Sequence, residues 1–146
     1  MTPTVASVGD RGWRVAQGAF DGHPVIVRCN PGFRGAIDRA EWPIRIGVAF
    51  PLRAPDTIGW PSRTEGDELG RAEDEIVRLA ADRAVIVAVI TVNGVRELVL
   101  HARESGWIEQ FHREAREAIA THEVQVVAER DPDWEVFEDL VGSLLA

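Results

Sequence analysis

Two residues in this sequence could carry out chemistry together. Glu73 lies four residues after Leu69 and three before Ile76, so helical spacing places its carboxylate on the apolar side of a helix. His112 follows Ile108 by four residues, at the equivalent place in a second apolar pattern. If the two helices pack side by side, a buried carboxylate beside an imidazole suits general acid–base catalysis, because burial and mutual charge shift both pKa values. The alternative is that both residues border their apolar stripes and reach solvent or structural partners.

A second group of residues could hold an anion. Arg28, Asn30 and Arg34 lie close together near the end of a predicted strand, and a guanidinium group donates to carboxylate or phosphate oxygens in a two-pronged geometry. These arginines would otherwise pair with the excess of acidic residues. Trp60, in a proline-rich loop, is a candidate contact residue for a partner, unless it folds back over the core.

Other catalytic and metal-binding patterns do not occur in the sequence. The chain has no lysine, no GxSxG elbow and no glycine-rich phosphate loop. Its only cysteine, Cys29, lies in a predicted strand, where a buried structural thiol is expected. Metal-ligand spacing is missing from the four histidines, His23, His101, His112 and His122. We therefore expect no metal and no cofactor.

The composition predicts a single α+β domain over residues 1–146. The chain is 45% hydrophobic and has a net charge of −8, which disfavours direct binding of nucleic acid and favours a basic protein partner. The first twelve residues lack the pattern of a signal peptide. The longest uncharged apolar run, 84–95, is shorter than the ~20 residues that span a bilayer. We expect no membrane segment and a cytoplasmic location.

Periodicity predicts the elements that must position these residues. The predicted strands cover residues 13–17, 24–29, 42–50, 83–92, 95–102 and 123–129. The predicted helices cover residues 62–82, 105–119 and 131–144. Asp21-Gly22 and Asn93-Gly94 are typical of tight hairpin turns, and Ser62 with Glu65 has the spacing of a capping box.

The order of these elements predicts a ferredoxin-like fold. After the first hairpin, the order strand, helix, strand, strand, helix, strand is the split βαβ pattern. The N-terminal β-hairpin and the C-terminal helix are additions to this sandwich. Residues 84–92 are apolar on both faces of the strand, so both faces need cover. Two helices would cover one face, and the hairpin, the last helix or a second copy of the chain would cover the other.

Five short stretches, taken in order, carry a resemblance to a known family. They are Arg28-Cys29-Asn30, Trp42-Pro43, Glu73-Asp74, Asn93-Gly94-Val95-Arg96-Glu97 and Asp131-Pro132-Asp133-Trp134. Between about residues 13 and 140 the chain resembles a bacterial family of uncharacterised proteins, domain of unknown function 695. The family pattern favours an aromatic residue where His101 stands. Some members are joined to a domain similar to regulators of ribonuclease activity, which implies a regulatory or binding role.

The sequence as a whole favours a non-catalytic binding or regulatory module over an enzyme. We expect an acidic surface that contacts a basic protein partner, or a homodimer formed through the sheet. One alternative is a small hydrolase or isomerase that uses Glu73 and His112, with Arg28 or Arg34 holding an anionic substrate. Another is an immunity-type inhibitor protein that blocks the active site of a toxin.

Overall fold

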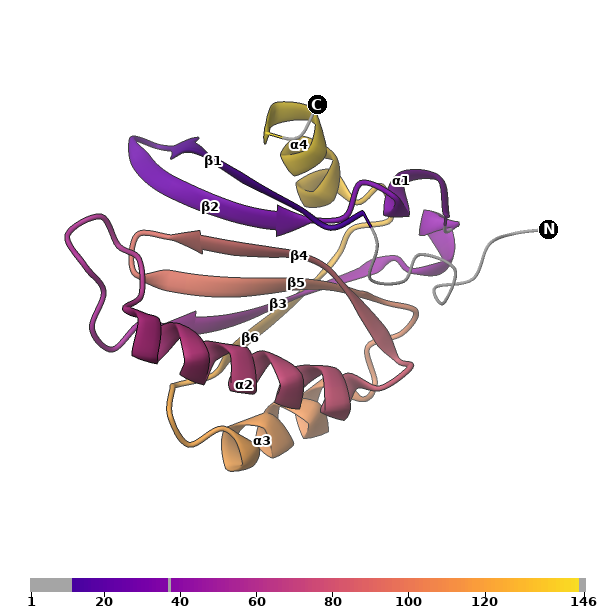
Figure 1. Ribbon diagram of the computed structural model, residues 1–146. Coiled ribbons are helices and arrows are strands. Elements are labelled where there is room, and N and C mark those ends of the chain that lie inside the picture. The colour runs from indigo at the N-terminus through magenta and orange to yellow at the C-terminus, as the bar shows by residue number, and fades with distance from the viewer. Residues whose placement is uncertain (1–11, 37, 145–146) are drawn as a thin grey trace.

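The structure is a computed structural model that describes residues 12–36 and 38–144 (Figure 1). Its six strands form one antiparallel sheet in the order β1-β2-β4-β5-β3-β6. The strands are β1 (Arg14–Phe20), β2 (His23–Cys29), β3 (Ile44–Pro51), β4 (Ala84–Val92), β5 (Val95–Ala102) and β6 (Gln125–Arg130). The helices are α1 (Phe33–Ala36), α2 (Arg63–Ala80), α3 (Ile108–Ala118) and α4 (Glu135–Leu144). The protein is therefore a mixed α+β structure, as the sequence predicts.

The two tight hairpin turns are confirmed. Asp21 and Gly22 join β1 to β2, and Asn93 and Gly94 join β4 to β5. All four residues have positive φ angles, between 48° and 81°, which is the geometry that a two-residue hairpin with a type I′ turn requires. These local turns fix the register of both hairpins next to the turns.

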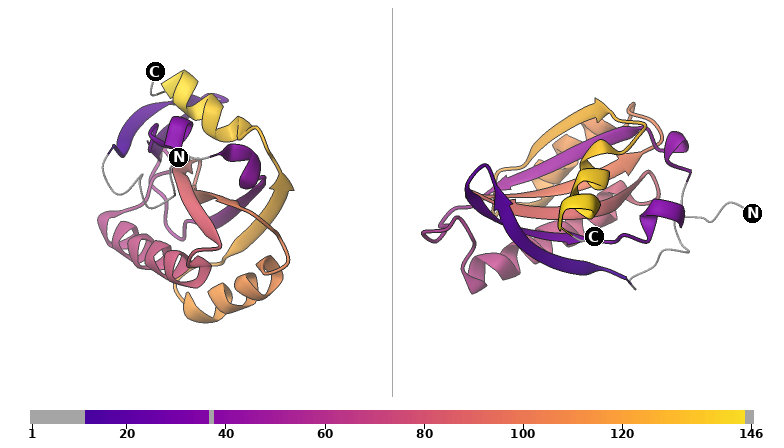
Figure 2. Two further views of the ribbon diagram at one scale, coloured as in Figure 1. Left: turned by 90° about the vertical axis from the view of Figure 1, so that its right-hand side faces the viewer. Right: turned by 90° about the horizontal axis from the view of Figure 1, so that it is seen from above.

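Helices cover both faces of the sheet (Figures 1 and 2). On one face, α2 and α3 pack over the larger core, which includes Phe50 and Phe111. On the other face, α4 packs over a smaller core that includes Trp134 and Phe137. The register of β4 shifts between Ile86 and Ala88, and its side chains reach both cores. The doubly apolar strand is therefore covered by the last helix, one of the three expected possibilities.

Of the differences between the predicted boundaries and the structure, three change the local structure most. The expected loop before residue 42 contains α1 and a 3₁₀ turn. Helix α3 begins at Ile108 rather than at Ser105, and no side chain caps its first turn. Helix α4 begins at Glu135 rather than at Pro132, because Trp134 takes a positive φ of 54° and is fully buried before the helix. Asp131 still caps this helix, since its Oδ1 accepts from the backbone N–H of Glu135 at 3.0 Å.

No helix in the described part of the chain combines the length and the hydropathy needed to cross a membrane. Residues 1–11, on which the expectation of no signal peptide mainly rests, lie outside the described residues.

Candidate functional site

A cleft of about 340 Å³ lies beside α2, between this helix and strands β2, β4 and β5 of the sheet. Apolar side chains line much of it, among them Trp13, Val77 and Ile86. Its charged wall is formed by Arg28 of β2 and Glu73 of α2, two of the residues singled out in the sequence. Two of the predicted candidate residues, Arg28 and Glu73, therefore line the same cleft.

The alternation of β2 positions Arg28 in this cleft. Val25, Val27 and Cys29 are buried beneath α4, so the residues between them point to the opposite face, toward α2. The Nη2 atom of Arg28 donates to Oε2 of Glu73 at 2.7 Å. The Arg28 side chain is 39% exposed and that of Glu73 is 18% exposed. This ion pair therefore stays accessible to a ligand while its carboxylate is largely shielded.

A second arginine, Arg96 of β5, belongs to the same electrostatic group. It lies opposite Thr91 in the β4–β5 hairpin, and its Nε donates to the Thr91 hydroxyl oxygen at 2.9 Å. Burial lowers the pKa of Arg96, the positive charge of Arg28 lowers it further, and the carboxylate of Glu73 raises it. Among the described residues Arg96 forms no ion pair. The group thus contains two guanidinium charges and one carboxylate charge.

Arg34 and Asn30 do not join Arg28 in this cleft. Arg34 lies on α1 and pairs with Glu138 of α4, with Nη2 to Oε2 at 2.7 Å. This hydrogen bond holds the pKa of Glu138 below its usual value. Asn30 is buried, and its Oδ1 accepts from the backbone N–H of Gly32 at 2.9 Å. The three residues that were expected to hold an anion together therefore lie apart, because the chain turns beneath α4 directly after β2.

The structure gives Glu73 and His112 different partners. Glu73 is bound to Arg28, whereas Nε2 of His112 donates to the carbonyl oxygen of Val124 at 2.8 Å. No hydrogen bond joins Glu73 to His112 in the described part of the chain. His112 instead connects α3 to the segment that leads into β6, which is a structural role.

Trp60 is partly buried rather than fully exposed. Its loop folds on itself, since Oδ1 of Asp56 accepts from the backbone N–H groups of Ile58 and Trp60 at 3.0 and 2.9 Å. The loop also packs against the β4–β5 turn, because the N–H of Gly94 donates to the carbonyl oxygen of Gly59 at 3.0 Å. The indole N–H of Trp60 is buried without a hydrogen-bond partner among the described residues.

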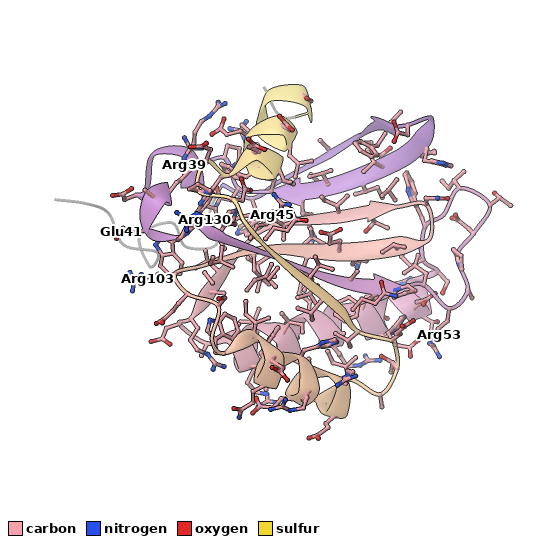
Figure 3. The ribbon with its side chains drawn as sticks, turned by 180° about the vertical axis from the view of Figure 1, so that it is seen from behind. Arg39, Glu41, Arg45, Arg53, Arg103 and Arg130 are labelled. Atoms are coloured by element: carbon pink, nitrogen blue, oxygen red, sulfur yellow. The ribbon has the colours of Figure 1, made fainter. Side chains whose placement is uncertain are left out.

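A buried carboxylate–imidazole pair does exist, between residues that sequence reasoning did not join. Oε2 of Glu65 accepts from Nε2 of His122 at 2.6 Å, and the two backbone N–H groups of Arg53 and Ala54 donate to the same carboxylate at 2.7 and 3.1 Å. Burial raises the pKa of Glu65, but these hydrogen bonds outweigh burial and hold it below its usual value. The pair lies near Arg53, at the end of the strands opposite Arg45 (Figure 3). It is not among the residues that line the cleft beside α2.

His101 forms a second buried group that the sequence did not indicate. Its ring stacks on Trp134 with centroids 4.0 Å apart, and its Nδ1 donates to the carbonyl oxygen of Trp42 at 2.9 Å. The indole N–H of Trp134 donates to the same oxygen at 3.0 Å. Burial lowers the pKa of His101 to about 4, so this histidine is neutral at pH 7. Oδ2 of Asp131 lies 3.9 Å from Nε2 of His101 and accepts from Arg45 at 2.9 Å.

Most of this chain matches the model of a known protein family. A family described as of unknown function, DUF695, matches residues 11–141. The chain belongs to this family. No curated protein and no solved structure matches it.

The five stretches that carry the resemblance to DUF695 gather at two places in the structure. Three of them supply Arg28, Glu73 and Arg96 to the charged group beside α2. The other two meet around the His101 ring, where Trp42 accepts from Trp134. Arg28 and Glu73 of the first group line the cleft, whereas the second group is buried, so we take the first group as the candidate binding site and the second as structural. Arg96 was part of a recognised stretch, which is the one sequence signal that could have revealed it.

Proposed function

We propose that this DUF695 chain is a non-catalytic binding module whose cleft beside α2 recognises an anionic group of its ligand. The observation that carries the proposal is the shared carboxylate: Glu73 balances only one of the two charges of Arg28 and Arg96. The chain as a whole has a net charge of −8, so a group with one unbalanced positive charge, of which Arg28 lines the cleft and Arg96 is coupled to it, is unusual for this protein. A carboxylate or phosphate group would supply the missing negative charge and accept from the free guanidinium N–H groups.

The groups able to do acid–base or nucleophilic chemistry lie away from this cleft, which favours binding over catalysis. The Glu65–His122 pair is buried, with 3% and 6% of each residue exposed. Burial raises the pKa of the Cys29 thiol to about 12, so this cysteine stays protonated and unreactive at neutral pH. His101 is fully buried and neutral at pH 7. The cleft itself offers a carboxylate that is already occupied by an arginine.

A second candidate function is recognition of a basic protein through α4 and the turn before it. Asp133, Glu135 and Asp139 are exposed there, and no arginine of the described residues pairs with them. In contrast, Glu138 on the same helix is neutralised by Arg34 and Arg39. Unpaired surface acids attract a basic partner, and an immunity-type inhibitor would use the same feature.

We also infer that residues 44–130 form a ferredoxin-like unit. The spatial order β4-β5-β3-β6 and the two helices on one face support this assignment. In this interpretation β1, β2 and α4 are additions that extend the sheet and cover its second face. Because that fold serves many functions, it does not by itself favour a ligand.

The anion site is tested by titrating the protein with inorganic phosphate and with succinate at low ionic strength, using calorimetry and NMR chemical shifts. Arg28→Gln and Arg96→Gln should each weaken binding by about tenfold, because each removes a charge-assisted pair of hydrogen bonds. Glu73→Gln should strengthen binding, because it removes the competing carboxylate. The matched control is Arg116→Gln, an exposed arginine on α3, which should leave binding unchanged. Equal binding by wild type and both arginine variants, or no binding of either anion, would refute the anion site.

The α4 candidate has a separate test. A variant with Asp133→Asn, Glu135→Gln and Asp139→Asn should lose proteins that the wild type captures from a native lysate, while its phosphate binding stays unchanged. The control removes the same charge elsewhere, through Glu104→Gln, Glu117→Gln and Glu123→Gln, all at exposed positions. Loss of the same proteins from both variants would show an effect of net charge alone and would reject α4 as the binding surface.

A further inference from the structure

Strand β1 is an edge strand without the features that usually protect an edge. Within residues 12–36 and 38–144 it pairs only with β2, runs from Arg14↔Cys29 to Phe20↔His23 without a bulge, and lies at the outer margin of the sheet (Figure 1). Arg14 is its one charged residue, and it contains no proline. Val15 and Phe20 are each 65% exposed. Natural proteins block free edges with charges, prolines or bulges, because an open row of N–H and C=O groups pairs with other strands.

The hydrogen-bonding groups that β1 leaves free are arranged symmetrically. In a two-residue hairpin the residues that flank the turn bond to one another, so Phe20 directs its backbone groups to His23. Backbone groups then alternate in direction along the strand. The outward-facing groups therefore belong to Val15, Gln17 and Ala19, with Gln17 at their centre.

We propose that β1 pairs antiparallel with β1 of a second copy of this chain, about a two-fold axis at Gln17, so that the sheet continues across a homodimer. This register places Gln17 opposite the partner's Gln17 and Val15 opposite the partner's Ala19, and every outward backbone group of these residues finds a partner. Interfaces of this kind are self-complementary, as two-fold symmetry requires. The inference goes beyond the anion site and does not depend on it.

The side chains and charges of β1 fit this partner. Antiparallel pairing about Gln17 sets Arg14 opposite the partner's Phe20, so an exposed ring is covered by an arginine side chain. It also sets Arg14 next to the partner's Asp21, and neither residue forms an ion pair within the described chain. No like charges face each other, and the small residues Ala16 and Gly18 oppose one another on the α4 side. A strand from an unrelated protein would need to reproduce this pattern, whereas a second copy already has it.

The oligomeric state gives the first test. Sedimentation of the wild type over a range of micromolar concentrations should show a monomer–dimer equilibrium. Gln17→Pro should abolish the dimer, because it removes an N–H that points outward and is not used within the β1–β2 hairpin. The control Gln17→Thr keeps that N–H and should still dimerise. A wild type that stays monomeric, or a Gln17→Pro variant that folds and still dimerises, would overturn the proposal.

Disulfide trapping tests the register itself. Directly opposed residues in a hydrogen-bonded antiparallel pair have Cα atoms about 5.5 Å apart, within the range of a disulfide. Gln17→Cys alone should therefore form a cross-linked dimer under mild oxidation. Val15→Cys alone should not, since its two copies would be more than about 13 Å apart along the strands, but a mixture of Val15→Cys and Ala19→Cys should cross-link. Equal cross-linking by Val15→Cys alone would reject this register.

Discussion

Replacing Glu65 should destabilise the fold more than replacing any surface acid, because three donors converge on this one buried carboxylate. In Glu65→Ala the N–H groups of Arg53 and Ala54 and Nε2 of His122 lose their acceptor. A buried donor left without a partner costs about 1–3 kcal/mol, and hydrogen bonds to a charged group such as this carboxylate contribute more than those between neutral groups. We expect Glu65→Ala to lower the free energy of unfolding by about 3–5 kcal/mol.

The milder variant Glu65→Gln removes the charge of the carboxylate but keeps part of its hydrogen bonding. Its amide oxygen can take the place of Oε2 and keep the hydrogen bonds from Arg53 and His122. Its NH₂ group then faces the N–H of Ala54, where Oε1 accepted at 3.1 Å, so two donors meet. The expected loss is about 1–3 kcal/mol.

The effect of Glu65 should also depend on pH. The folded protein holds the pKa of Glu65 below its ordinary value of 4.5, so its contribution to stability is present above that value. The contribution is lost as the pH falls through the lowered folded-state pKa. The difference in the free energy of unfolding between wild type and Glu65→Gln should therefore be constant near neutral pH. It should shrink on acidification below about pH 4.5.

Urea denaturation followed by tryptophan fluorescence measures these changes across a pH series. Glu75→Gln is the matched control, because Glu75 lies on the same helix and forms an exposed pair with Arg78, and exposed pairs contribute less than about 1 kcal/mol. The reasoning about convergent donors is wrong if Glu65→Ala and Glu75→Gln lower the free energy of unfolding by the same amount. It is also wrong if the difference in this free energy between wild type and Glu65→Gln grows below pH 4.5.

Three further experiments have defined outcomes. Burial raises the pKa of Glu97, so Glu97→Gln should increase the free energy of unfolding at pH 7 by up to about 1 kcal/mol after solvent screening, and by less at pH 4; a decrease at pH 7 would contradict this. Gly59→Ala should lower the free energy of unfolding, measured by heat or urea, by more than about 1 kcal/mol, because φ of Gly59 is +89° and the new Cβ would lie 2.8 Å from the backbone nitrogen of Gly94. A variant as stable as the wild type would contradict this prediction. Glu73→Gln and His112→Ala should be additive to within about 0.5 kcal/mol in a double-mutant cycle, since the two residues have different partners; a larger coupling would show that they interact.

Elements with strong local signals could be predicted from the sequence. Asp21-Gly22 and Asn93-Gly94 favour a tight turn because of their own backbone preferences, and both hairpins have that turn. Helix α2 begins after Ser62, whose Oγ accepts from the N–H of Glu65 at 3.1 Å, as half of the expected capping box. The Glu65 carboxylate does not complete the box by binding back to Ser62. The carboxylate instead accepts hydrogen bonds from donors outside the helix, and no local sequence pattern indicates these partners.

The candidate site was predictable residue by residue but not as a group. Arg28 and Glu73 were each singled out from their spacing, but their ion pair links positions 45 residues apart. Apart from its place in a stretch that resembles the family, Arg96 has no local feature that indicates a role beside them. It joins the site because β4 lies between β2 and β5 in the sheet, and the register of the β4–β5 hairpin places Arg96 opposite Thr91.

The sequence by itself determined the α+β class, the two hairpin turns and the need to cover both faces of β4, because turn geometry and the spacing of apolar residues act over a few residues. Only the tertiary structure decided that α4 provides the second cover, that Glu73 pairs with Arg28, and that Glu65 pairs with His122. These pairings depend on strand order and helix packing, which are set when apolar side chains from distant parts of the chain are buried together.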